Sequence, residues 1–127
     1  MRAVIDTSYL VEFLIKPFNE GFRWVFDADL IAPDLLVYEL HNVLLKALKI
    51  GQDDLNKFQK ILINLNLKYI NIAGDEEKIY RLAFKHSLSF YNASYLWLAV
   101  KNNLPLATID RQILKIAECK FISTGTV

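Results

Sequence analysis

Two short apolar segments of the chain each end in an aspartate, and carboxylates delivered in this way could bind a divalent metal ion. Residues 3–5 lead into Asp6, and residues 106–109 lead into Asp110. Both segments are typical of buried strands, and open parallel sheets bind their ligands beyond the carboxyl ends of the strands. Each aspartate taken alone fits the capping of the following helix slightly better than it fits chemistry. Because two strands end alike, we favour convergence of the two carboxylates on one site.

A glutamate and an asparagine are candidates to complete this site. Glu39 lies in an expected helix over residues 34–49, at the edge of its apolar stripe. A carboxylate so close to a core needs hydrogen bonds or a compensating charge such as a metal ion, unless its stem lies along the boundary and its head reaches water. Asn92 follows Ser89, the expected cap of an almost wholly apolar helix, and lies where backbone amides are still unpaired. Its amide could serve the structure or the site.

Hydroxyl and basic side chains accompany these candidates. Ser8 and Thr108 lie two residues from the aspartates and could hold a metal-bound water or a phosphate oxygen, although a structural role is preferred for each alone. Lys46, Lys49 and Arg111 are candidates to contact phosphate. For the two lysines, the slightly favoured alternative is that they complement the dipole of their helix.

The remaining reactive residue types have ordinary expected roles. No Ser/His/Asp set is evident, and His41 and His86 are expected at the surface. The single cysteine, Cys119, is expected in the core; it excludes an intramolecular disulfide and a cysteine-based zinc site, and it favours a reducing compartment. Trp24, Trp97 and the phenylalanines are expected in the core or an interface rather than as platforms for base stacking.

The composition limits the class of protein. The length of 127 residues fits one domain over residues 1–127, and an apolar share of 54% excludes disorder and suggests that a partner covers some apolar surface. The net charge of +1 is low for a protein that simply coats phosphate. The early charge of Asp6 is unlike a signal peptide, and no apolar stretch is long enough to span a bilayer, so we expect a cytoplasmic protein without membrane contact.

Helices are expected to alternate with short apolar strands along the chain. This order predicts an α/β domain with a parallel sheet of about four to five strands, flanked by helices on both faces. Thr7 or Ser8 is expected to cap the first helix. The expected strands are residues 3–5, 30–32, 68–72, 106–109 and 120–122; the expected helices are 7–15, 20–28, 34–49 (ended by Gly51), one from 53 that carries Leu65, 75–86, 89–101 and a short one after 110.

In this order the motifs resemble those of the PIN domain family, over essentially the whole chain. Val-Ile-Asp-Thr-Ser around Asp6 resembles the opening of these domains, and Pro33 before the helix with Glu39 resembles their second motif. Tyr-Asn-Ala around Asn92, followed by Tyr-Leu, resembles the third, and Thr-Ile-Asp ending at Asp110 resembles the fourth. The family usually has an aspartate where this chain has Asn92.

The resemblance implies a ribonuclease that depends on Mg²⁺ or Mn²⁺, most often the VapC-type toxin of a toxin–antitoxin pair. It implies one or two metal ions among Asp6, Glu39 and Asp110, with Asn92 as a weaker ligand, and Ser8 and Thr108 as accessory hydroxyls. It further implies an RNA substrate, a homodimer and an antitoxin protein that plugs the cleft.

Two other interpretations of the sequence stay open, and the first of them rests on Asn92. An amide offers a carbonyl oxygen but neither charge nor base, so the chain could be an impaired PIN-like module that binds RNA or an antitoxin without cutting. A receiver-like phosphoacceptor domain ranks lower, because no adjacent acidic pair ends the first strand.

Overall fold

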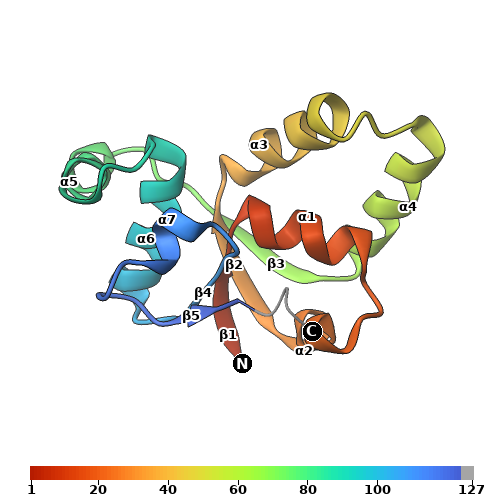
Figure 1. Cartoon of the computed structure of the whole chain (residues 1–127), viewed down its shortest axis with the longest axis horizontal. Coiled ribbons are helices and arrows are strands. Elements are labelled where there is room, and N and C mark those ends of the chain that lie inside the picture. The colour runs from red at the N-terminus through yellow and green to blue at the C-terminus, as the bar shows by residue number, and fades with distance from the viewer. Residues whose placement is uncertain (124–127) are drawn as a thin grey trace.

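The computed structural model describes residues 1–123 and contains one parallel sheet of five strands in the order β3-β2-β1-β4-β5 (Figure 1). The predicted α/β class with a parallel sheet is confirmed. Residues 124–127 of the predicted domain lie outside the described part. The strands are β1 (Arg2–Ile5), β2 (Asp29–Pro33), β3 (Asn66–Ile70), β4 (Leu106–Ala107) and β5 (Phe121–Ile122).

The central strand β1 is apolar because helices cover both of its faces. Ala3, Val4 and Ile5 are fully buried, as expected for an interior strand of a parallel sheet. β1 pairs with β2 through Val4 and Ile31 on one side, and with β4 through Ile5 and Ala107 on the other. The core therefore forms on both sides of this strand.

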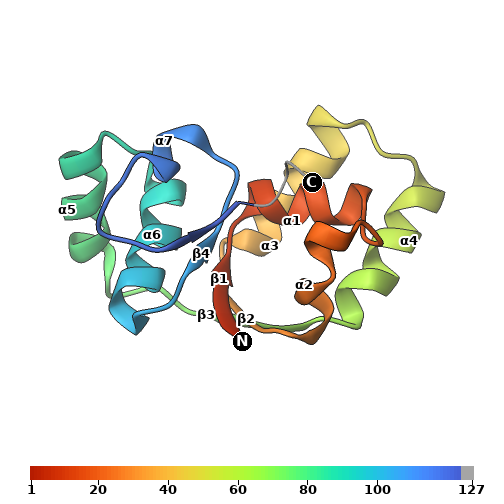
Figure 2. The same ribbon diagram turned by 60° about the horizontal axis from the view of Figure 1, so that its bottom comes forward.

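The helices divide between the two faces of the sheet. Figure 2 shows the helices that follow β1 and β2 on one side and the helices that follow β3 and β4 on the other. The first group is α1 (Thr7–Ile15), the 3₁₀ turn η1 (Glu20–Phe22), α2 (Trp24–Asp27), α3 (Leu36–Asn42), the π-helical turn η2 (Val43–Ala47) and α4 (Gln52–Ile63). The second group is α5 (Glu76–His86), α6 (Phe90–Asn102) and α7 (Arg111–Leu114).

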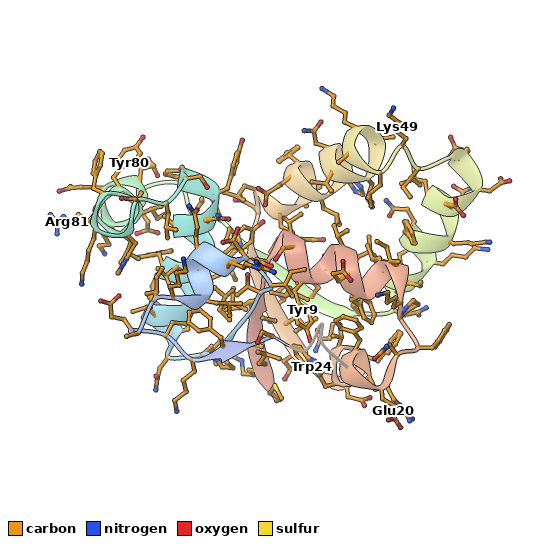
Figure 3. The ribbon with its side chains drawn as sticks, viewed as in Figure 1. Tyr9, Glu20, Trp24, Lys49, Tyr80 and Arg81 are labelled. Atoms are coloured by element: carbon orange, nitrogen blue, oxygen red, sulfur yellow. The ribbon has the colours of Figure 1, made fainter. Side chains whose placement is uncertain are left out.

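Aromatic side chains fix α1 against α2. The indole Nε1 of Trp24 donates a hydrogen bond of 2.9 Å to the hydroxyl of Tyr9, and Figure 3 shows these two side chains turned toward each other. The rings of Tyr9 and Phe22 pack edge to face with centroids 5.3 Å apart. Trp97 is buried on α6, and Cys119 is partly buried against the core. Trp97 is therefore in the core, as expected. Trp24 is half-buried, which is consistent with its expected position in the core or an interface.

Three predicted helix boundaries are wrong, for local reasons. Asp6, rather than Thr7 or Ser8, caps α1, because its side chain accepts from the Tyr9 amide. The helix expected over 20–28 is a 3₁₀ turn, capped by Asn19, followed by one short α-helical turn. The helix expected over 34–49 begins at Leu36 and finishes in the π-helical turn; Gly51 begins α4 instead of ending the preceding helix.

Two predicted strands are also corrected. β3 covers residues 66–70 rather than 68–72, because its register is set by pairing with β2, from Asp29 opposite Asn66 to Pro33 opposite Ile70. Alternation of side chains along one segment does not reveal that partner. β4 stops at Ala107 instead of continuing to residue 109, since Thr108 and the residues after it turn into the cap of α7.

None of the helices in the described part of the chain is long and apolar enough to cross a bilayer. His41 and His86 are both half-buried, which is consistent with the surface positions expected from the sequence. Nε2 of His86 lies 2.8 Å from Oε2 of Glu118.

The C-terminus of α5 offers a test of the backbone geometry. Ser87 ends this helix in the left-handed region, with φ 55° and ψ 44°. Glycine has no Cβ to strain there, so Ser87→Gly should raise the free energy of unfolding by about 0.5–1 kcal/mol in urea titrations. Ser87→Ala keeps a Cβ and should bring no gain. Equal stability of the glycine variant and the parent would contradict the assigned geometry.

Candidate active site

Asp6 and Asp110 meet at the carboxyl edge of the sheet. Asp6 follows β1 and Asp110 follows β4, which are adjacent strands, and the Asp6 amide donates to the Ala107 carbonyl over 3.1 Å. The chain leaves β1 toward β2 and later returns to β4 on the other side, so the two aspartates flank the point where the strand order reverses. Ligands of doubly wound sheets bind at this point. The predicted convergence is therefore found.

Both aspartates also cap the helices that follow them. Oδ1 of Asp6 accepts a hydrogen bond of 2.9 Å from the Tyr9 amide. Oδ1 of Asp110 accepts from the amides of Gln112 and Ile113, over 2.9 and 3.1 Å. The sequence offered helix capping and convergence of the two carboxylates as alternatives, but both occur. In each aspartate, Oδ1 caps the following helix while the carboxylate also lies at the shared site.

Two hydroxyls bind the same carboxylate. Ser8 Oγ donates to Asp6 Oδ1 over 2.7 Å, and Thr108 Oγ1 donates to Asp6 Oδ2. The hydroxyl oxygens in turn accept from the backbone, Ser8 from the Ile109 amide at 3.1 Å and Thr108 from the Asp110 amide at 3.0 Å. Both predicted accessory hydroxyls thus lie at the site, where they tie the first turn of α1 to the end of β4.

Asp6 is an anion buried without a cation. Its side chain is 2% exposed, and burial raises the pKa of its carboxyl from 3.8 to about 6, with a smaller contribution from neighbouring Asp110. Hydrogen bonds from Thr108, the Tyr9 amide and Ser8 lower this pKa without cancelling the effect of burial. Within residues 1–123, neither aspartate forms an ion pair with a basic side chain. A bound cation would supply the missing positive charge.

Glu39 approaches the site from α3, and two hydroxyls hold it. Oε1 of Glu39 accepts from Thr7 Oγ1 over 2.5 Å and from the Tyr95 hydroxyl over 2.8 Å. We did not identify Thr7 or Tyr95 as site residues from the sequence. Thr7 directly follows Asp6, and Tyr95 lies three residues after Asn92, so it shares the face of α6 that carries this candidate.

Asn92 bonds to the second aspartate. Its side-chain amide donates to Oδ2 of Asp110 over 3.4 Å, and its backbone amide donates to Ser89 Oγ over 3.1 Å. The predicted cap of α6 is therefore confirmed. The side-chain amide of Asn92 thus contributes a hydrogen-bond donor and no negative charge to this site.

These residues surround one pocket of about 400 Å³. Its walls also include Glu12 of α1, a carboxylate that we did not single out from the sequence. The predicted phosphate contacts Lys46, Lys49 and Arg111 are exposed and do not line it, and Figure 3 shows Lys49 beyond the end of η2. The full lining is Asp6, Thr7, Ser8, Val11, Glu12, Glu39, Val43, Asn92, Tyr95, Ile109 and Asp110.

The donor set fits a hard divalent cation held in part by water. In the described residues, no three His, Cys, Asp or Glu side chains are close enough together to form a ready metal cluster. Mg²⁺ commonly takes only one or two carboxylates and retains several waters. Asp6 and Asp110 supply two carboxylates, and the pocket leaves space for water.

The fold is that of a known family. The family model of the PIN domain matches residues 3–118, which is most of the chain. The protein belongs to the PIN domain family.

One curated relative of the chain is a VapC protein. A curated relative, Exonuclease VapC9 of Pyrobaculum aerophilum, is 32% identical over 82 residues, which are 63% of this chain and 61% of that protein. The chain thus aligns with about three fifths of the relative's length.

Solved structures share the fold at low identity. PAE2754 of Pyrobaculum aerophilum has a TM-score of 0.71 at 23% identity, covering 96% of this chain and 92% of that one. Mycobacterium tuberculosis VapC20, described as a sarcin–ricin loop cleaving toxin, has a TM-score of 0.67 at 13% identity, covering 93% and 98%. At these identities the likeness establishes the fold.

The raised pKa of Asp6 predicts how stability depends on pH without metal. Between pH 3.8 and about 6 the folded protein holds the Asp6 proton more tightly than the unfolded chain. This group therefore makes the free energy of unfolding fall as pH rises through that window. Asp6→Asn lacks the effect, and in urea titrations with EDTA it should be about 1–3 kcal/mol more stable than the parent at pH 7.5.

The advantage of Asp6→Asn should shrink toward zero near pH 4, where the parent carboxyl is protonated. The matched control is Asp29→Asn, which removes an exposed carboxylate at the opposite edge of the sheet and should show no such trend. If the parent and Asp6→Asn had equal free energies of unfolding at pH 7.5, burial of the ionised Asp6 carboxylate would not destabilise the fold, and the prediction would be wrong.

Asn92→Asp should replace the hydrogen bond between Asn92 and Asp110 with repulsion between two carboxylates, and a bound metal ion should relieve this repulsion. The new carboxylate would face Asp110 where the amide now donates, so the metal-free protein should lose about 1–2 kcal/mol of stability. Mn²⁺ should then raise Tm more in this variant than in the parent. Asn102→Asp, at the far end of the same helix, is the control and should not change the response to Mn²⁺. An unchanged Mn²⁺ response in Asn92→Asp would place position 92 outside the metal site.

Proposed function

We propose that this protein is a metal-dependent ribonuclease and the toxin component of a toxin–antitoxin pair. The observation that carries the proposal is the pair Asp6 and Asp110: two carboxylates on adjacent strand ends, at a pocket, without a basic partner in the described residues. Nucleases of the PIN family generally use divalent metal ions. The names of the relatives, an exonuclease and a toxin that cleaves the sarcin–ricin loop, support the same class of reaction.

Each side chain has a defined part in the proposed site. Asp6 and Asp110 hold Mg²⁺ or Mn²⁺, Glu39 faces it with its remaining oxygen, and Asn92 is the weaker ligand through its carbonyl oxygen. A divalent ion in such a site lowers the pKa of water and stabilises charge on a phosphate undergoing substitution. Ser8 and Thr108 keep the Asp6 carboxylate in one orientation, so the protein needs no nucleophile of its own.

The substrate contacts lie outside the pocket. Arg111 begins α7 directly after Asp110, and Lys46 and Lys49 follow Glu39 along the same helical segment; all three are exposed. We assign them to phosphates of RNA that extends away from the scissile bond. Removing any one of them should therefore weaken RNA binding more than turnover.

The proposed partners are an antitoxin protein and a second copy of the chain. Large apolar side chains are exposed on several elements, among them Phe18, Tyr38, Ile63 and Phe84, each at least 78% accessible. A protein partner that covered such side chains would gain free energy from their removal from water. The single free cysteine favours the reducing cytoplasm as the site of action.

A second candidate function rests on Asn92. Its amide already donates to the Oδ2 atom of Asp110 and adds no negative charge, so metal binding is weakened there. The protein would then be a PIN-like module that binds RNA or an antitoxin without cutting.

Cleavage of a panel of structured RNAs in Mn²⁺ or Mg²⁺ separates the two functions. The parent should cut, EDTA should stop it, and Asp6→Asn should reduce the rate at least about 100-fold. Asp29→Asn should cut like the parent. Cleavage that persists in EDTA would refute metal dependence, and cutting by Asn92→Asp but not by the parent would establish the non-cutting module.

A further inference from the structure

Three oxygen atoms from three separate elements meet beside the pocket. Thr7 of α1 and Tyr95 of α6 both place a hydroxyl on Oε1 of Glu39 from α3, at 2.5 and 2.8 Å. The two hydroxyl oxygens are themselves 2.8 Å apart. Thr7 is 7% exposed and Tyr95 is 1% exposed, so water does not compete freely for these contacts.

The two hydroxyls occupy one oxygen of the carboxylate and leave the other unused. The Thr7 and Tyr95 hydroxyls each carry one proton, and both hydroxyl oxygens lie against Oε1 of Glu39 rather than Oε2. Within residues 1–123, Oε2 of Glu39 accepts no hydrogen bond. Glu39 lines the pocket, so Oε2 is the atom with which it can bind a ligand there.

From this geometry we infer that Thr7 and Tyr95 are positioning residues that fix the Glu39 carboxylate so that Oε2 alone serves the pocket. The inference rests on the proposed metal-dependent function, because it assigns Oε2 to the cation. Partners that orient a ligating carboxylate typically change metal affinity or activity about 10–100-fold when they are removed.

The chemistry of the donors suits this role. Burial, together with the Glu39 and Asp6 carboxylates, raises the pKa of the Tyr95 hydroxyl, so the phenol keeps its proton at working pH and remains a donor. Both donors are neutral, and they orient the anion without cancelling its charge. A lysine or arginine in the same place would bind Glu39 more strongly but would remove its attraction for a cation.

The Tyr95 hydroxyl has no separate packing role that explains its presence. The ring is buried in the core, and a phenylalanine would fill the same volume. Within the described residues, its hydroxyl oxygen lies within hydrogen-bonding distance only of Thr7 and Glu39. Tyr95→Phe and Thr7→Val therefore remove the donors while preserving the shape.

The test is a double-mutant cycle on Mn²⁺ affinity, measured by calorimetry, with RNA cleavage as a second readout. Tyr95→Phe should weaken Mn²⁺ binding about 10-fold and lower kcat by a similar factor, with KM for RNA nearly unchanged. Thr7→Val should act in the same direction. In a Glu39→Gln background, Tyr95→Phe should cause no further loss, because the hydroxyl acts through the carboxylate.

Ser94→Ala is the matched control. Ser94 also carries a buried hydroxyl on α6, but it donates to the Tyr91 carbonyl and does not line the pocket. This variant should bind Mn²⁺ like the parent. Equal losses from Tyr95→Phe with and without Glu39→Gln would show a general structural effect and overturn the inference.

The cycle also separates the inference from the proposed function. If the parent binds Mn²⁺ and the hydroxyl variants bind it equally well, the positioning role is wrong while the metal site stands. If the parent binds no Mn²⁺, the proposed function and the inference fail together. If the parent binds Mn²⁺ but does not cleave RNA, the proposed ribonuclease function is wrong. The double-mutant cycle on Mn²⁺ affinity still tests whether Thr7 and Tyr95 position Glu39.

Discussion

The end of the central strand holds a buried carboxylate that no basic side chain of the described residues neutralises. Asp6 is almost inaccessible, and burial raises the pKa of its carboxyl to about 6. A fully apolar strand end would be more stable, so this position costs the fold free energy. Three hydrogen-bond donors limit the cost, and they come from α1 and from the segment after β4. Hydrogen bonds to the single carboxylate of Asp6 therefore join α1 to the segment after β4.

The carboxylates of Asp6, Asp110 and Glu39 are all held by neutral donors. The hydroxyls of Ser8 and Thr108 donate hydrogen bonds to Asp6, and backbone amides donate to Asp110. The hydroxyls of Thr7 and Tyr95 contact Glu39. Neutral donors fix geometry but leave net negative charge, which is the condition for attracting a cation. Asn92 follows the same chemistry, since its amide orients Asp110 without adding charge. The exposed lysines and Arg111 remain apart from this set.

The sequence predicted the sheet and its acidic edge because both leave local signals. Apolar runs that end in aspartate identify β1 and β4, and parallel topology brings their ends together. Thr7 and Tyr95 left no comparable signal: a threonine at a helix start and a tyrosine in an apolar helix both fit ordinary packing. Their role exists only where α1, α3 and α6 meet, which depends on tertiary contacts. The shift of β3 by two residues has the same origin, because β2 sets its register.

The position of β4 beside β1 has a consequence for the synthesis of the protein. The pocket combines residues that are far apart in the sequence, from Asp6 to Asp110, and β1 acquires its second neighbour only when β4 is available. A nascent chain synthesised only through α4 contains Asp6 and Glu39 but not Asp110. The pocket therefore cannot assemble until the residues through Asp110 have left the ribosome, and a chain terminated before that residue would lack it.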